Sequence, residues 1–109
     1  MTDLLHARCQ GQGAVSMGDA EIHSHLAQVS GWRLNDGAIE KTFSFKNYYE
    51  TIAFVNALAW ICNIEDHHPD LQVSYDRCVA RFSTHSVSGI SRNDFICAAK
   101  ADALVSFVG

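Results

Sequence analysis

The sequence predicts an α+β fold: one domain with the element order α-β-β-α-β-β-α, in which three helices pack on one face of a four-stranded antiparallel sheet. Two observations predict it. Apolar residues recur at helical spacing in three segments, and two pairs of short segments with alternating polar and apolar residues lie between them. Turn-forming residues separate the members of each pair, so each pair should form an antiparallel hairpin.

Length and composition support a single core. The chain has 109 residues, of which 48% are hydrophobic and 18% are charged. These values are ordinary for a globular protein, and the chain is long enough for one core and too short for two.

The N-terminal part divides into two segments. Residues 1–15 show no sustained period of apolar residues, so we predict a flexible N-terminal tail before a domain that spans residues 16–109, with Leu4 and Leu5 docking on the body. A capping segment should then start the first helix, which Gly31 closes. The apolar residues of this helix are Ile22, Leu26 and Val29.

The first predicted hairpin consists of a short strand over 32–34 and a longer strand over 39–45. The Asn35-Asp36-Gly37 sequence between them is typical of a tight turn.

The longest predicted helix begins at Asn47 and runs to about Asp66. Asn47 and Glu50 have the spacing of a capping box. Its apolar residues form two stripes, of which the second must meet another helix or another subunit. We expect this second stripe to join subunits in a homodimer or homotetramer; it consists of Phe54, Leu58 and Ile61.

The second hairpin and the last helix complete the fold. Strands are predicted over 71–75 and 78–85, with Ser83 and His85 facing away from the core. Ser91 and Asp94 have the spacing that caps a helix, which should run to about Phe107.

Charge and residue usage exclude several classes of protein. The net charge is -4 and only eight residues are Lys or Arg, so we expect no nucleic-acid partner. No apolar run is long enough to span a bilayer, and the N-terminus lacks the features of an export signal. Four cysteines without C-x-x-C spacing suggest reduced, mostly buried thiols, and we therefore expect a cytoplasmic protein.

The stretch His67-His68-Pro69 is the strongest candidate for chemistry. Pro69 must end the preceding helix, so both histidines lie at its C-terminus or just beyond it. An unperturbed imidazole titrates at about pH 6.5 and can give or take a proton near neutrality.

With Tyr75, His85 and Asp94, this stretch resembles the motif of the pterin-4a-carbinolamine dehydratases. Members of that family are small α+β proteins that remove water from 4a-hydroxytetrahydropterin to give quinonoid dihydropterin. The resemblance covers about residues 16–105, and three shorter matches also resemble the bacterial members. These matches are Gly31-Trp32, Phe43-Ser44-Phe45 and Asn93-Asp94-Phe95-Ile96.

The resemblance implies a site and partners. The implied catalytic residues are His67, His68 and His85. The implied substrate-binding residues are Asp66, Ser83, Thr84 and Asp94. The reduced pterin is then the substrate, no metal or other cofactor is needed, and the function is linked to an aromatic amino acid hydroxylase. His67 and His85 would form the acid–base pair, in an order that the sequence does not decide.

One position departs from the family pattern. Asn63 stands where the family carries a charged residue. An amide can orient an imidazole by a hydrogen bond but supplies no charge, so we expect Asn63, one helical turn before His67, to tune the site rather than to silence it.

Two other functions remain open at this point. The chain could be a non-catalytic relative that serves as a dimerising or assembly-helper protein, although its three histidines favour catalysis. A zinc site built from the same histidines is less favoured, because adjacent histidines rarely reach one ion.

Overall fold

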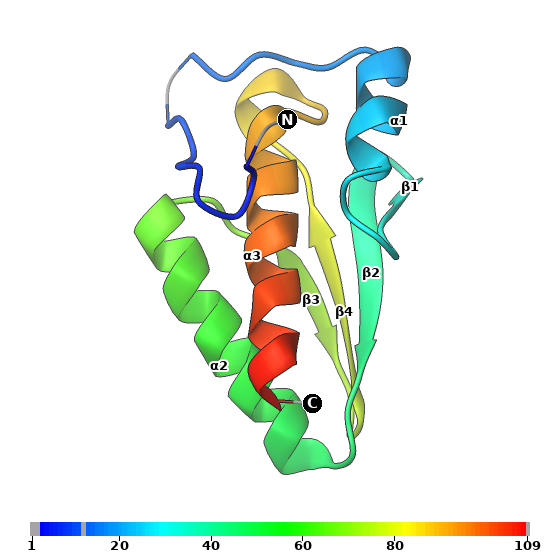
Figure 1. Ribbon diagram of the computed structural model, residues 1–109, viewed down its shortest axis with the longest axis vertical. Coiled ribbons are helices and arrows are strands. Elements are labelled where there is room, and N and C mark those ends of the chain that lie inside the picture. The colour runs from blue at the N-terminus through cyan, green and yellow to red at the C-terminus, as the bar shows by residue number, and fades with distance from the viewer. Residues whose placement is uncertain (1–2, 12, 109) are drawn as a thin grey trace.

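The computed structural model describes residues 3–11 and 13–108, and it confirms the predicted α+β architecture (Figure 1). Two hairpins alternate with three helices, and a short 3₁₀ turn precedes the last helix. The elements are α1 (Asp19–Leu26), β1 (Arg33–Asn35), β2 (Ala38–Ser44), α2 (Tyr48–Glu65), β3 (Asp70–Val73), β4 (Arg77–Phe82), the 3₁₀ turn η1 (His85–Val87) and α3 (Arg92–Val108).

The sheet is antiparallel throughout, with the strand order β1-β2-β4-β3. Its two hairpins join through β2 and β4, which leaves β3 at one edge. Asp70, the first residue of β3, pairs with Arg81 near the end of β4. This register brings the loop that follows α2 next to the chain that leaves β4, and the candidate site lies there.

The core lies between one face of the sheet and the helices α2 and α3, which run side by side in Figure 1. Burying a large apolar side chain stabilises a fold by about 1.5–3 kcal/mol, so these residues supply much of the stability. The largest fully buried apolar side chains are Phe54, Phe82, Phe95, Ile39 and Leu58.

Asn47 caps the start of α2 as predicted, and Glu50 reaches back to the residue before the cap. The Asn47 side chain accepts a hydrogen bond from the Glu50 N–H at 3.0 Å, and the Glu50 carboxylate accepts one from the Lys46 N–H at 3.0 Å. The bond to Asn47 satisfies a backbone donor that the helix itself leaves free, and the bond from Lys46 holds the chain that enters the helix.

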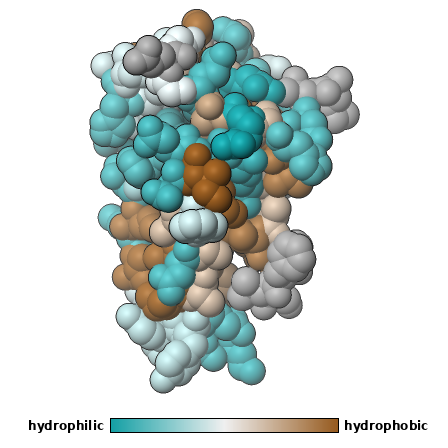
Figure 2. Space-filling model, turned by 90° about the vertical axis from the view of Figure 1, so that its left-hand side faces the viewer, coloured by the Kyte–Doolittle hydropathy of each residue, from teal (hydrophilic) through white to brown (hydrophobic). Residues whose placement is uncertain are grey.

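The expected subunit contact through the second stripe of α2 is wrong. Phe54 and Leu58 are fully buried within the chain, and the Phe54 ring packs against Phe43 and Phe45. Only Ile61 of this stripe is partly exposed. The large side chains that α2 exposes lie elsewhere. Trp60 is 65% exposed and Ile64 is 48% exposed in its second half, and Tyr48 and Tyr49 are exposed at its start. Figure 2 views the side of the molecule on which α2 lies, and hydrophobic side chains gather in the middle of it.

The largest differences from the predicted boundaries lie in β4 and α1. Strand β4 ends at Phe82, so His85 lies in the turn η1 and not on a strand. The Thr84 N–H and carbonyl pair with Gly89, and this closes a small loop in which a strand cannot continue. Helix α1 ends at Leu26, and its N-cap residue Gly18 offers no side-chain hydrogen bond.

The N-terminal segment has contacts with the body. Leu4 is 5% exposed and belongs to the core cluster, whereas Leu5 is 38% exposed. The flexibility of the segment stays a prediction. Among the helices described, none combines the length and apolar character needed to cross a membrane.

Candidate active site

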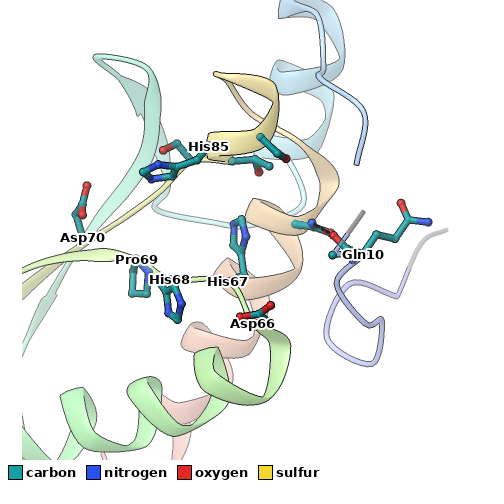
Figure 3. A pocket seen from close by; sticks show the side chains of 12 residues that line it. Gln10, Asp66, His67, His68, Pro69, Asp70 and His85 are labelled. Carbon is teal, nitrogen blue, oxygen red and sulfur yellow. Dashed lines mark hydrogen bonds between the residues drawn. The ribbon is translucent and has the colours of Figure 1, made fainter. Parts of the chain in front are cut away.

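A cavity of about 410 Å³ lies between the end of α2, the end of β4 and the start of α3. This volume is typical of sites for small molecules. Figure 3 shows its residues, with His67 pointing from the end of α2 toward the turn that carries His85. The lining residues are Gln10, Gly11, Asp66, His67, His68, Pro69, Asp70, Ser83, Thr84, His85, Ser86 and Asn93.

The end of α2 sets the direction of the two adjacent histidines. Asp66 adopts the left-handed conformation with φ 54°, and its N–H bonds to the Asn63 carbonyl while the His67 N–H bonds to the Cys62 carbonyl. This pair of bonds is a Schellman motif, which ends a helix and reverses the chain. As a result, His67 turns inward and His68 remains exposed.

His67 is held by a buried carboxylate. Its Nε2 lies 2.6 Å from Oδ1 of Asp94, and the two side chains are 10% and 0% exposed. The His67 ring also stacks on Phe82, with the ring centroids 6.1 Å apart and an angle of 10° between the planes. Because a carboxylate can only accept, His67 donates from Nε2, and this fixes both its orientation and its tautomer.

Asp94 is itself fixed by two more hydrogen bonds. Its Oδ2 accepts from the Thr84 hydroxyl at 2.8 Å and from the Ser91 N–H at 3.0 Å. Asp94 therefore caps α3 and binds His67 with the same carboxylate. The N-terminus of α3 carries the positive end of the helix dipole, which favours a negative charge at this position.

The other predicted site residues lie around His67. Asp66, His68 and His85 are exposed at the cavity, and Ser83 is partly buried. Thr84 is buried, and its hydroxyl also lies 2.7 Å from the Ser91 hydroxyl. The fold thus brings the seven predicted site residues to one region, whereas their catalytic and binding roles stay predictions.

Asn63 does not lie where the sequence suggested. It is exposed and is not one of the cavity-lining residues, because α2 ends at Glu65 and the chain turns before His67. The helical spacing of four residues therefore does not bring the Asn63 and His67 side chains together.

The Glu65 side chain points toward the N-terminal segment and not toward His67. Its carboxylate accepts the Cys9 N–H at 2.8 Å and pairs with Arg8 at 3.0 Å and Lys100 at 3.8 Å. Burial alone would raise the pKa of Glu65, but the Cys9 hydrogen bond and the charges of Lys100 and Arg8 hold this pKa below its usual value. Glu65 therefore anchors the N-terminal segment.

This anchored segment supplies two cavity residues that the sequence did not reveal, Gln10 and Gly11. The Gln10 N–H donates to Oδ1 of Asn93 at 2.9 Å, and the Asn93 amide donates to the Gln10 carbonyl at 2.7 Å. No periodicity or motif marks residue 10. The Asn93-Asp94 pair indicated that polar groups lie at the start of α3, but it did not indicate that Gln10 would contact them.

In the part of the chain that the structure describes, no group of three or more His, Cys, Asp or Glu side chains is placed to hold a metal ion.

Comparisons with known proteins identify the family of the chain. The family of pterin 4 alpha carbinolamine dehydratases matches residues 15–104. A relative from Stenotrophomonas maltophilia strain R551-3, provisionally named a pterin-4-alpha-carbinolamine dehydratase, is 57% identical over 111 residues, which cover 95% of this chain and 96% of the relative. A relative from Nitrosomonas europaea with the same provisional name is 50% identical and covers 95% of this chain and 92% of its own length.

A solved structure extends the agreement to the fold. The transcriptional coactivator/pterin dehydratase of Brucella melitensis superposes with a TM-score of 0.80 at 28% identity, over 83% of this chain and 98% of that one. The match to the family spans the helix end, the turn and the helix start that together build the cavity. The chain therefore belongs to the pterin 4 alpha carbinolamine dehydratase family.

Proposed function

We propose that this protein removes water from 4a-hydroxytetrahydropterin to give quinonoid dihydropterin, by general acid–base catalysis with its histidines. This reaction would return the tetrahydropterin cofactor used by an aromatic amino acid hydroxylase. The observation that supports the proposal best is the buried His67–Asp94 pair beside a cavity that also receives His68 and His85.

The reaction needs two proton transfers. An acid must protonate the 4a-hydroxyl group as it leaves as water, and a base must take a proton from the ring nitrogen system of the pterin. Imidazoles suit both tasks near neutral pH. The pterin is the substrate, and the proposal requires no further cofactor.

The positions of the side chains suggest how the work is divided. His67 is oriented by Asp94 and would exchange a proton with the substrate together with His85, which approaches from η1. His68 is exposed at the mouth and would bind and orient the pterin. Asp66 and Ser83 offer polar groups for its amide edge, while Thr84 acts through Asp94.

We expect the purified protein to accelerate the loss of enzymatically generated 4a-hydroxytetrahydropterin without added cofactor, and to do so equally in a metal chelator. The absorbance change on dehydration measures this rate against the spontaneous reaction. Turnover that chelation abolished and zinc restored would contradict the acid–base proposal.

The second candidate is a non-catalytic role in an assembly. The Brucella melitensis structure carries the name of a transcriptional coactivator as well as of a pterin dehydratase, and this supports the alternative. The two functions differ in one measurement. A chain that binds a partner protein but leaves the dehydration at its spontaneous rate would belong to the second class.

We also propose that the chain forms a homo-oligomer through the exposed face of α2. Trp60 and Ile64 are one turn apart on this face, beside an apolar hollow of about 370 Å³ lined in part by Leu5, Ile61 and Leu104. A second copy would present the same apolar side chains, as a two-fold interface requires.

Replacing Trp60 and Ile64 by aspartate should convert the oligomer to a monomer, because each buried subunit contact would then contain four unpaired carboxylates. Sedimentation velocity at micromolar concentration measures this change. Val15→Asp is the matched control, since Val15 is 75% exposed and lies away from α2, and this variant should keep the wild-type mass. A monomeric wild-type chain would contradict the proposal.

A further inference from the structure

Three of the four cysteines gather where the N-terminal segment crosses the two long helices. The Sγ atoms of Cys9 and Cys97 lie 3.6 Å apart, and Cys62 on α2 is near enough to Cys97 on α3 to shift its pKa. The fourth, Cys78, is buried in β4 and lies outside this cluster. The proposed dehydration uses none of these thiols.

The two sulfurs of the close pair differ in access to solvent. Cys9 is partly exposed, whereas Cys97 is fully buried in α3. Its contacts with Cys62 and Cys9, together with burial, raise the pKa of Cys97 above its usual value. Since the thiolate is the reactive form, an oxidant dissolved in water should meet Cys9 first.

The backbone around Cys9 holds this arrangement and still allows movement. Hydrogen bonds from the Cys9 N–H to Glu65 and from the Gln10 N–H to Asn93 fix the segment over the start of α3. Closing the sulfurs from 3.6 Å to the disulfide length of about 2.05 Å is a small shift. Cys9 lies outside any helix or strand and can make this shift, whereas Cys62 and Cys97 each sit within a packed helix.

We propose that Cys9 and Cys97 form a reversible disulfide when the protein meets a small-molecule disulfide such as oxidised glutathione. The Cys9 thiolate attacks one sulfur of glutathione disulfide and releases one glutathione thiolate, which takes up a proton. Cys97 then attacks the Cys9 sulfur of the mixed disulfide and transfers its proton to the second departing glutathione. Two cysteine thiols are oxidised and one glutathione disulfide is reduced to two glutathione thiols.

The bond would fix one wall of the cavity. Gln10 follows Cys9 directly and lines the cavity with Gly11, and Asn93 is one helical turn from Cys97 on α3. A disulfide between residues 88 positions apart also restricts the unfolded chain. The oxidised protein should therefore keep the segment docked and melt roughly 5 °C or more above the reduced protein. An effect of the disulfide on turnover would rest on the proposed dehydratase function. The formation of the disulfide itself does not depend on that function.

The test oxidises the full chain with glutathione disulfide and follows free thiols, mass and melting. We expect the titratable thiols of the unfolded protein to fall from four to two, a mass lower by two hydrogens, and a Cys9–Cys97 linked peptide after digestion. Dithiothreitol should reverse all three changes and the shift in melting temperature.

Two variants make the result specific. Cys9→Ser changes a partly exposed residue, should fold, and should form no disulfide under the same conditions. Cys78→Ala removes a buried cysteine outside the cluster and should still form the Cys9–Cys97 bond. A Cys62–Cys97 linked peptide, a stable glutathione adduct on Cys9, or four free thiols after oxidation would each overturn the proposal.

Discussion

Replacing His67 or His85 by alanine should lower the turnover of 4a-hydroxytetrahydropterin by roughly a hundred-fold or more. A positioned acid or base contributes about 10²–10⁴-fold to a proton-transfer step, and dehydration needs both an acid and a base. His67 is fixed by Asp94 and by stacking on Phe82, so its truncation removes an imidazole whose orientation the fold sets. His85 is exposed at the cavity, and its truncation should leave the core unchanged.

The measurement is single-turnover dehydration, compared with the spontaneous rate and accompanied by melting curves of each variant. Asn63→Glu is the matched comparison, since it places a carboxylate in the last turn of α2 but outside the cavity lining. A screened surface charge is worth about 0.2–1 kcal/mol, so this variant should change turnover by no more than a few-fold. Full activity of a folded His67→Ala protein would remove this residue from the mechanism, and strong activation by Asn63→Glu would show that position 63 controls catalysis.

The fold could be predicted because each element has a local signal. Alternating polar and apolar residues, together with turn residues, indicated the two hairpins. The capping pairs Asn47–Glu50 and Ser91–Asp94 indicated the starts of α2 and α3. The outcome for the apolar stripes of α2 was different. A stripe shows that a helix face is buried, but it does not show whether the same chain or another subunit buries it. Here Phe54 and Leu58 are fully buried within the chain, with Phe54 packed against Phe43 and Phe45.

The same limit applies to the site. The spacing of His67, His85 and Asp94 could be read from the sequence, and the fold brings all three to one cavity region. The contact of Gln10 with Asn93 joins segments 83 residues apart. Neither the residue types nor the spacing of apolar residues in the sequence predicts such a contact. Glu65 likewise lies two residues before His67 yet faces the N-terminal segment, because the left-handed Asp66 turns the chain between them.

Asp94→Asn should lower turnover about as strongly as loss of His67 itself, with less effect on folding. Three groups donate toward the Asp94 carboxylate: the His67 ring, the Thr84 hydroxyl and the Ser91 N–H. In the variant, the amide oxygen can satisfy the Ser91 N–H only if the amide NH₂ group faces His67. His67 must then accept at Nε2 and carry its proton on Nδ1, which is the opposite tautomer.

The expected result is a fall in kcat of roughly a hundred-fold or more, with a much smaller change in KM, because the cavity walls remain in place. Nitrogen-15 spectra of the imidazoles should show the His67 proton on Nε2 in the wild type and on Nδ1 in the variant. Ser91→Ala is the control: it removes a hydroxyl bonded to Thr84 and the Asn93 N–H but leaves the His67–Asp94 bond intact. This control should lose on the order of 1 kcal/mol of stability and keep turnover within a few-fold. If Asp94→Asn reversed the tautomer and retained turnover, the orientation of His67 by Asp94 would not matter for the reaction.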